Sequence, residues 1–328
     1  MKLTTKLSVI NSIFKIKLFN TNIPIVISWM ITKRCNYMCK YCNDQKLTDQ
    51  EELDTKQIFF IIDKLSKIGT KIISLTGGEP LLREDIGKIV DYCAEQDIFV
   101  GINSNGSLVR DKIAELTKLN ALNLSLDGPE EVNDSIRGPG SFKAVIEASD
   151  IAYSRGIRIK FSAVLSKHNL DFKCIDYLLE LAKKFNTTVF FQPAEQKLLR
   201  ANGINPLTPP EQAYKAAINY LISKKGHNKH IGNSVSGLKH LYSWPNPKKI
   251  KCTGMFNRID NQGNVMVCPR IQRSGKGANF LSTDFKELFM KSDPFYCDSC
   301  CCASRIEMNY LFSLKPDVIF NMKQSIWW

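Results

Sequence analysis

Residues 25–44 read IVISWMITKRCNYMCKYCND, an apolar run that ends at Ile31–Thr32 and leads directly into three cysteines. The spacing of Cys35, Cys39 and Cys42, C-x3-C-x2-C, supplies three thiolates from one tight loop. A [4Fe–4S] cube has four corners, so three protein ligands leave one iron free to bind another molecule. This stretch therefore predicts a strand followed by a loop that can hold a cluster with one open iron.

Beyond this stretch, apolar β-branched runs alternate with amphipathic helical stretches up to about residue 195. The expected strands are Ile25–Thr32, Lys71–Thr76, Ile98–Asn103, Ala121–Leu126, Arg158–Leu165 and Thr188–Gln192. The expected helices are 55–68, 84–96, 109–119, 141–155 and 170–185. Six such units predict a parallel sheet, because each parallel connection needs a crossover helix. The predicted fold class is α/β, a partial (β/α)6 TIM-like barrel with the cysteine loop on its active face.

The composition is that of a folded protein with an uneven positive charge. The 328 residues are 44% hydrophobic and 23% charged, which is ordinary for a chain that buries a large core. The net charge is +13, and the stretch from Lys197 to Arg258 holds eleven Lys or Arg against the single acid Glu211. This stretch is either a solvated basic face or a surface that attracts an anionic substrate or partner. No zinc finger, RNP motif or interleaved aromatic and basic stripe occurs, so a nucleic-acid partner is not expected.

Residues 1–24 form a basic amphipathic segment with no acidic residue. Its helical spacing is carried by Leu3, Leu7, Ile10 and Phe14. The pattern favours either a cap on the bottom of the barrel or contact with an anionic membrane surface. No apolar run of 18 residues and no signal-peptide pattern is present, so we expect a cytoplasmic protein, with peripheral contact at the inner membrane surface as the alternative.

The eleven cysteines fall into two groups and two single residues. Without a signal peptide, this usage indicates metal binding rather than disulfides. Cys93 and Cys174 stand alone and are expected to be inert core thiols. In the tail, Cys252 and Cys268 flank a hairpin signal at Ile259–Val265, and Cys297-Asp-Ser-Cys300 follows. Four thiolates at this spacing suit zinc or a [4Fe–4S] cube equally well.

These patterns predict four regions along the chain. They are an N-terminal basic segment at 1–24, a barrel core at 25–200, a linker or helical substrate-facing region at 201–250, and a small cysteine-rich α+β domain at 251–328.

The segment Cys35–Cys42 resembles the signature of the radical S-adenosylmethionine (SAM) superfamily. The resemblance covers roughly residues 25–195, with a further match in the tail. It implies that the amino and carboxylate groups of SAM chelate the fourth iron. One electron from the cube then splits SAM into methionine and a 5′-deoxyadenosyl radical, which abstracts a hydrogen atom from the substrate. It also implies a flavodoxin- or ferredoxin-type electron donor.

The same resemblance implies a set of SAM-binding residues at the ends of the strands. Gly77, Gly78, Glu79 and Pro80 match the family's GGEP motif, which would bind the methionine ammonium. Small polar groups for the ribose or carboxylate come from Asn103, Ser104, Ser125 and Asp127, with Arg137 steadying the carboxylate, Tyr41 packing on adenine and Gln192 lining the pocket. The alternatives are a tight strand-to-helix turn at Gly77–Pro80, turn-stabilising roles for Ser125 and Asp127, and a surface ion pair for Arg137.

The tail is similar to the twitch domain, a shortened SPASM domain that carries one auxiliary [4Fe–4S] cluster. The resemblance assigns Cys252, Cys268, Cys297 and Cys300 to that cluster. Cys301 and Cys302 have three open interpretations: a structural thiol, an alternative ligand, or a hydrogen-atom donor to a substrate radical.

An auxiliary cluster near the active site can accept the electron that a substrate radical leaves. The leading hypothesis is therefore a radical SAM oxidoreductase that dehydrogenates an anionic small molecule or a lipid- or sugar-linked substrate. Within the same class, the alternatives are an epimerase and a peptide maturase, the latter weakened because no leader-binding domain is recognised. From another class, the alternative is a metal-binding scaffold protein with a zinc knuckle.

Overall fold

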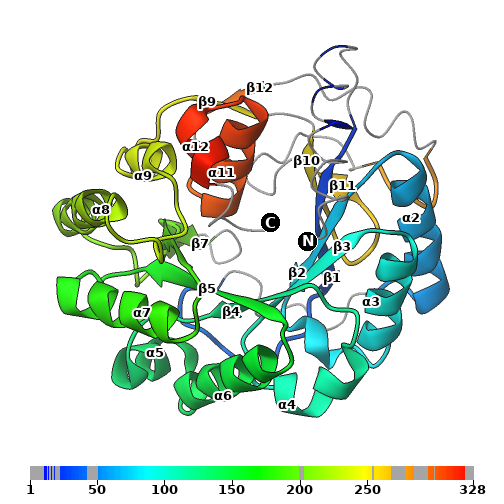
Figure 1. Ribbon diagram of the computed structural model, residues 1–328, viewed down its shortest axis with the longest axis horizontal. Helices are drawn as coiled ribbons and strands as arrows, with labels where there is room; N and C mark the ends of the chain where they lie inside the picture. The colour runs from blue at the N-terminus through cyan, green and yellow to red at the C-terminus, as the bar shows by residue number, and fades with distance from the viewer. Residues whose placement is uncertain are drawn as a thin grey trace.

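An eight-stranded sheet curls into an open barrel at the centre of the protein (Figure 1). The computed structural model describes residues 23–42, 51–198, 203–252, 255–266, 278–283, 295–298 and 300–321, and some residues between 11 and 18. The first six strands are β1 (Val26–Thr32), β2 (Ile72–Gly77), β3 (Phe99–Ser104), β4 (Ala121–Ser125), β5 (Arg158–Leu165) and β6 (Val189–Pro193). They lie side by side in chain order and are all parallel. The prediction of an α/β partial barrel is confirmed.

Two strands from the tail extend this sheet beyond β1. β10 (Phe256–Ile259) pairs with β1 in parallel, and β11 (Val265–Met266) pairs with β10 in antiparallel fashion. Gly263 lies in the connection with φ +84°, a backbone conformation that favours glycine. The hairpin expected in the tail is thus present, but it belongs to the barrel sheet. Strands on both sides of residue 251 therefore share one sheet. The domain boundary predicted at that residue stays a prediction.

Helices cover the outer face of the sheet as a ring (Figure 1). They are α2 (Thr55–Lys67), α3 (Ile86–Glu95), α4 (Val109–Lys112), α5 (Glu130–Arg137), α6 (Ser141–Ser154), α7 (Phe172–Lys184) and α8 (Glu211–Lys225). In α2, Asp54 and Gln57 form a reciprocal capping box at the start. Its buried residues are Ile58, Ile61, Ile62 and Leu65. This spacing keeps one apolar stripe against the sheet.

Two helices differ from the sequence expectation. The predicted helix 109–119 is shorter, because α4 passes into a 3-10 helix at Ile113–Glu115 and the Asn120 side chain then accepts a 2.7 Å hydrogen bond from the N–H of Val100. This bond holds the chain at the start of β4. Helix α5 was not expected, because its sequence EEVNDSIR holds only two apolar residues, Val132 and Ile136.

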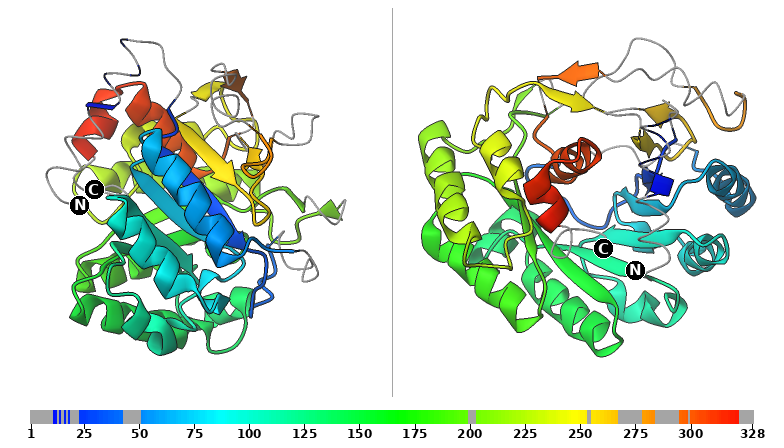
Figure 2. Two further views of the ribbon diagram at one scale, coloured as in Figure 1. Left: turned by 90° about the vertical axis from the view of Figure 1, so that its right-hand side faces the viewer. Right: turned by 45° about the horizontal axis from the view of Figure 1, so that its top comes forward.

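The tail closes the open side of the barrel. Helices α9 (Val235–Leu241), α11 (Ala303–Phe312) and α12 (Pro316–Asn321) stand where the ring of outer helices is interrupted (Figures 1 and 2). Helix α11 contacts β6 and β10, which are strands from opposite sides of the opening, and also β9 (Ile250–Cys252). β9 forms a separate two-stranded sheet with β12 (Phe295–Cys297).

A second apolar cluster fills the bottom of the barrel, at the amino-terminal ends of the strands. Val26, Ile72 and Phe99 meet Met308 and Phe312 of α11 there. Ile16, only 6% exposed, belongs to the same cluster, whereas residues 1–10 lie outside the described part of the chain. This burial agrees with the cap interpretation of the N-terminal segment. Among the described residues, no helix is both long and apolar enough to cross a membrane.

Candidate active site

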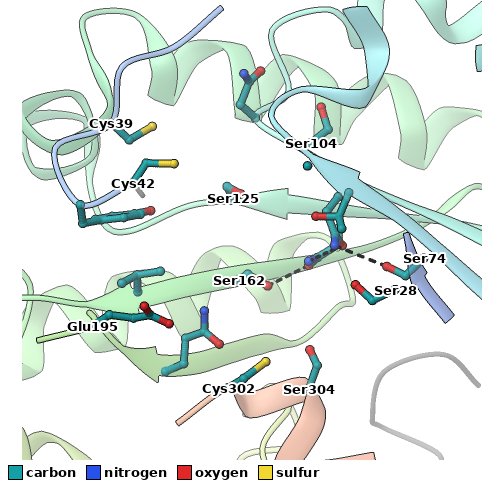
Figure 3. Close-up of a pocket in the computed structure, with 18 of the residues that line it drawn as sticks. Ser28, Cys39, Cys42, Ser74, Ser104, Ser125, Ser162, Glu195, Cys302 and Ser304 are labelled. Atoms are coloured by element: carbon teal, nitrogen blue, oxygen red, sulfur yellow. Dashed lines mark hydrogen bonds between the residues drawn. The ribbon is translucent and has the colours of Figure 1, made fainter. Parts of the chain in front are cut away.

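A cavity of about 440 Å³ opens at the carboxyl ends of the barrel strands. Many residues predicted from the sequence line it: Cys35, Cys39, Tyr41, Cys42, Gly77, Gly78, Asn103, Ser104, Ser125, Arg137, Gln192, Cys300, Cys301 and Cys302. Figure 3 shows Cys39 and Cys42 on one side of the cavity and Cys302 and Ser304 on the other. The two cysteine groups of the sequence therefore approach one space from opposite walls. None of the described residues in 203–250 lines this cavity, and the predicted substrate-facing role of that region stays a prediction.

The loop that carries the first three cysteines is held by backbone contacts. The N–H of Lys40 donates to the carbonyl of Ile136 at 3.0 Å, and the N–H of Cys42 donates to the carbonyl of Cys39 at 3.0 Å. Cys35 is exposed and Cys39 is buried. Loss of solvent around the sulfur atoms raises the pKa of Cys35 and of Cys39 above the ordinary value of a cysteine thiol. The positive charge of Arg137 partly opposes this shift. A metal is the partner that removes protons from such thiols.

Arg137 lies at the end of α5 and joins that helix to the cysteine loop. Its Nε donates to Asp127 Oδ2 at 2.7 Å, and its Nη2 contacts the Tyr41 hydroxyl. The same Asp127 oxygen accepts from the Tyr41 hydroxyl at 2.8 Å. Nη1 lies 4.0 Å from Cys39 Sγ. Burial works against the guanidinium charge, but Asp127 outweighs it and raises the pKa of Arg137.

These contacts change the interpretation of two predicted residues. The side chain of Asp127 is fully buried, and its second oxygen accepts from the N–H of Val164 at 2.8 Å, so it does not line the cavity. The structure thus places Asp127 behind the cavity wall, and its predicted contact with a ligand stays a prediction. The surface ion pair considered for Arg137 is also wrong, because the pair is buried.

Gly77 and Gly78 lie where the end of β2 meets the chain that enters the cysteine loop. The N–H of Gly78 donates to the carbonyl of Thr32 at 3.0 Å, and the N–H of Glu79 donates to that of Arg34 at 2.8 Å. A Cβ on Gly77 would lie 2.0 Å from the Thr32 oxygen, and one on Gly78 would lie 2.0 Å from the Arg34 oxygen. Only glycine permits this approach, so both glycines fix the position of the cysteine loop.

The Glu79 carboxylate points into the protein and does not line the cavity. It is 0% exposed and accepts from the Ser104 hydroxyl at 3.0 Å, the N–H of Asn105 at 2.7 Å and the N–H of Leu81 at 3.1 Å. Burial raises its pKa to about 7, while these donors lower it. Neighbouring turns use both oxygens of Glu79, and its predicted role in binding the methionine ammonium stays a prediction. Pro80 starts a 3-10 helix, Pro80–Leu82, and also lies outside the cavity wall.

A belt of small polar side chains crosses the inner face of the barrel below the cysteine loop. It consists of Ser28, Ser74, Asn103, Asn123 and Ser162. Asn123 donates to Asn103 at 2.9 Å, and Ser162 donates to Asn123 at 3.0 Å (Figure 3). Only Asn103 of this belt was predicted. The available signal was a polar residue at an inward position of an apolar strand, as at Ser162 between Phe161 and Ala163.

Three of the four cysteines predicted for the tail cluster are buried and close together. The antiparallel pairing of β9 with β12 brings Cys252 near Cys297, and Cys300 follows β12. The contact with Cys297 and then burial raise the pKa of Cys252, and burial raises the pKa of Cys300. Cys268 lies outside the described residues. Cys301 is buried and Cys302 is exposed, and both line the cavity.

The donor sets fit iron–sulfur chemistry. Each group offers thiols and no carboxylate among its predicted ligands, and thiolates are the ligands of such clusters. In the described part of the chain, no three His, Cys, Asp or Glu side chains converge as ligands of a single metal ion.

The fold and cavity define a barrel protein whose site lies at the carboxyl ends of parallel strands, where enzymes of this architecture bind their ligands. Residues 29–179 match the family model described as "Radical SAM superfamily". This part of the chain is a radical SAM domain, and the protein is a radical SAM enzyme with a cysteine-rich C-terminal region. The family uses SAM and a [4Fe–4S] cluster, and the C-terminal cysteines fit an auxiliary cluster.

Comparisons with known proteins agree with this family. The mycofactocin maturase MftC of Mycolicibacterium smegmatis is 28% identical over 285 residues, 83% of this chain and 71% of that protein. The Fe-coproporphyrin III synthase of Methanosarcina barkeri is 33% identical over 167 residues, 49% of this chain and 42% of that protein. The crystal structure of Streptococcus suis SuiB bound to SAM has a TM-score of 0.68 at 16% identity and covers 85% of this chain and 68% of that chain. SuiB has also been solved with its precursor peptide SuiA, at a TM-score of 0.66, 17% identity and coverage of 85% and 67%. The SuiB likeness supports the fold.

Proposed function

We propose that this enzyme oxidises a carboxylate-bearing substrate by hydrogen-atom abstraction in the cavity between its two cysteine groups. The observation that carries the proposal is the position of the groups on opposite walls of one cavity, with Cys39 and Cys42 facing Cys302 across the polar belt. When bound, SAM and its cluster supply a 5′-deoxyadenosyl radical, and an auxiliary cluster supplies an acceptor for one electron.

In this proposal, the chain holds SAM mainly through backbone and small polar groups. Gly77 and Gly78 expose strand-end backbone beside the cysteine loop and would receive the methionine part of SAM. The side chains of Asn103, Ser104 and Ser125 line the same wall and can bind hydroxyl or carboxylate oxygens. Arg137 holds Tyr41 and the loop in place, because Asp127 already occupies its guanidinium.

The substrate would lie between the polar belt and the start of α11. Arg258 of β10 lines this part of the cavity, in register with Ser28 of β1. Its Nε is buried and has no hydrogen-bond partner among the described residues. A buried N–H without a partner is costly, and a substrate carboxylate would satisfy it. Arg305 adds a second positive charge to the same wall.

A peptide is the carboxylate-bearing substrate that the comparisons favour. MftC is named a maturase, and SuiB has been solved with a precursor peptide. The reported comparisons name no lipid- or sugar-linked substrate. We therefore place peptides, which carry a terminal carboxylate, before lipid- or sugar-linked anions as candidates.

Oxidation by this route removes two hydrogens from the substrate. One leaves as a hydrogen atom that forms 5′-deoxyadenosine. The remaining electron passes to the auxiliary cluster, and a proton passes to solvent, so the substrate gains one double bond or ring. Anaerobically reconstituted enzyme should be incubated with SAM, a reductant and peptide fractions from cells grown in deuterated medium. Transfer of deuterium to 5′-deoxyadenosine, with a product two hydrogens lighter, supports the proposal.

Epimerisation is the second candidate, and the exposed position of Cys302 on the cavity wall favours it. A thiol there could return a hydrogen atom to the substrate radical. The same reaction run in D₂O separates the two candidates. A product that carries one solvent deuterium at carbon and has not lost two hydrogens supports epimerisation and contradicts oxidation. Loss of that deuterium in Cys302→Ala, with 5′-deoxyadenosine still formed, would assign the donor.

A further inference from the structure

Helix α11 presents a polar face to the auxiliary cysteines. Arg305 and Asn309 are four residues apart, so they lie on the same side of the helix. Their exposed fractions are 4% and 0%. Buried polar residues are unusual, and α11 holds Arg305, Glu307 and Asn309 beside Ile306, Met308 and Leu311, which pack into apolar clusters. Their contacts show what they face.

Asn309 donates a hydrogen bond directly to a predicted cluster ligand. Its Nδ2 lies 3.4 Å from Cys252 Sγ, and both residues are buried. An N–H directed at a ligand sulfur stabilises added negative charge on that sulfur. Hydrogen bonds to the sulfurs are among the factors that set the reduction potential of an iron–sulfur cluster.

Arg305 brings a positive charge to the same place. Its Nη1 donates to the carbonyl of Phe256 at 3.1 Å, and its guanidinium lies 4.3 Å from the centre of the Phe256 ring. Within the described ranges, no Asp or Glu forms an ion pair with it, so its charge is not neutralised there. Arg305 and Cys300 line the same cavity, and Arg305 lies on the side of α11 that also carries Asn309.

The N-terminal end of α11 adds positive electrostatic potential near the same cysteines. The helix begins at Ala303, directly after Cys300–Cys302, so its positive end points toward these cysteines. His240 fixes the same loop, with its Nε2 3.0 Å from the carbonyl oxygen of Cys300. A buried guanidinium, an amide N–H and a helix start thus converge on one group of thiols.

We propose that Arg305 and Asn309 raise the reduction potential of the auxiliary cluster so that it accepts the electron released by the substrate radical. This inference rests on the proposed oxidation. The electron balance is that given above: a one-electron reduction of the cluster accompanies loss of one proton from the substrate radical. The two residues are positioning residues, because neither has to touch the substrate for this effect.

The test measures the potential of the auxiliary cluster without any substrate. Cys35, Cys39 and Cys42 are changed to Ala in every sample, so that only the auxiliary cluster gives an electron paramagnetic resonance signal during redox titration. In Arg305→Gln, the ratio of reduced to oxidised cluster at a fixed potential should fall at least tenfold, which corresponds to 59 mV for one electron. Asn309→Leu should lower the ratio about threefold, since a neutral hydrogen bond is weaker than a charge.

Two variants complete the test. Arg305→Lys keeps the charge and should restore most of the wild-type potential. Arg258→Gln removes a charge from the same cavity but from β10, and should leave the potential unchanged. Equal potentials in wild type, Arg305→Gln and Asn309→Leu would overturn the inference, as would an equal shift in Arg258→Gln. If Arg305→Gln fails to retain iron, Asn309→Leu decides the outcome alone, with a wild-type potential counting against the inference.

This outcome is separable from that of the proposed function. The potential can shift as expected in an enzyme that proves to be an epimerase, in which case oxidation fails and the electrostatic effect stands. An oxidised product together with unshifted potentials would leave the proposed function in place and remove the role of α11.

Discussion

The two cysteine groups of this enzyme are built in opposite ways. Cys35, Cys39 and Cys42 come from one short loop at the end of β1, graded from exposed to buried, beside a polar cavity. Cys252, Cys297 and Cys300 come from separate segments that β-strand pairing brings together, and all three are buried. An open site can admit a second molecule to a cluster, whereas an enclosed site favours electron transfer. Burial thus distinguishes the two groups and agrees with the separate roles proposed for them.

The surroundings of the two groups repeat this contrast. The first group lies against the buried ion pair of Arg137 with Asp127, which neutralises the charge near the loop. The second group faces Arg305, which forms no ion pair with a carboxylate in the described part of the chain. A neutralised environment favours binding of the zwitterionic methionine part of SAM, while a net positive one favours uptake of an electron.

Removal of each cysteine group gives the largest expected effect. Cys39→Ala should abolish formation of 5′-deoxyadenosine from SAM, because a cube with two protein ligands has no stable open corner. Cys252→Ala with Cys297→Ala should leave that formation measurable and abolish substrate oxidation. The measurements are 5′-deoxyadenosine by chromatography and iron per chain. Cys93→Ala, a buried thiol outside both groups, is the control, and SAM cleavage that survives in Cys39→Ala would break the comparison.

Loss of the ion pair behind the first group should be the next largest effect. Asp127→Asn leaves Arg137 buried without a countercharge, and breaking a buried pair in this way costs about 3–5 kcal/mol of unfolding free energy. Urea unfolding measures it. Glu180→Gln, which removes an exposed partner 3.6 Å from Lys183, is the matched control and should cause no measurable change. In Asp127→Asn, the first cysteine group should lose iron before the tail group does. Equal loss of iron from both groups would show that the two regions are not independent.

A methyl group at the strand-end glycine tests how rigidly the first group is held. In Gly78→Ala the new Cβ meets the carbonyl oxygen of Arg34, so the chain must move at a cost of about 1–3 kcal/mol. Affinity for SAM should fall at least tenfold, as measured by equilibrium dialysis. Gly226→Ala is the control, since a Cβ there meets nothing within 4 Å. Wild-type affinity in Gly78→Ala would show that the loop is not fixed by this contact.

The last prediction concerns stability alone, which should depend on pH through one buried glutamate from each region. Burial raises the pKa of both Glu79 and Glu307 to about 7 from 4.5. The folded state therefore holds these protons when the unfolded state has lost them, so stability falls as pH rises from about 4.5 to about 7. Glu307→Gln should remove up to about 3 kcal/mol of that decrease in urea unfolding at several pH values. Exposed Glu211→Gln is the control, and an unchanged slope in Glu307→Gln would refute the assignment.

A further contrast follows from how the two carboxylates are bonded. Glu79 accepts from three donors, so an amide there would place N–H against N–H. One oxygen of Glu307 has no partner among the described residues, and the other accepts from the N–H of Ser234 at 2.8 Å. At pH 7, Glu79→Gln should therefore destabilise the protein more than Glu307→Gln does. The reverse order would contradict the hydrogen-bond assignment.

Features of this protein that depend on local pattern could be predicted from the amino-acid sequence. The six parallel strands were predicted within one or two residues of their ends, because apolar β-branched runs and the helices between them are read from neighbours in the chain. The cysteine loop, the strand-end glycines and the hairpin with Gly263 carry their signal in a few adjacent residues. Small polar residues inside strands, such as Ser162, carry a weaker signal, because a single polar residue hardly changes an apolar run.

Contacts between distant segments could not be predicted and became visible in the folded protein. The pairing of β10 with β1, the position of α11 between β6 and β10, and the approach of Asn309 to Cys252 join residues far apart in sequence. The inward turn of Glu79 and the capture of Arg137 by Asp127 depend on which donors the fold brings near. No local period records such choices, because burial and hydrogen-bond competition are settled when the whole barrel closes. The sequence therefore located the chemistry, and the fold determined which side chains face it.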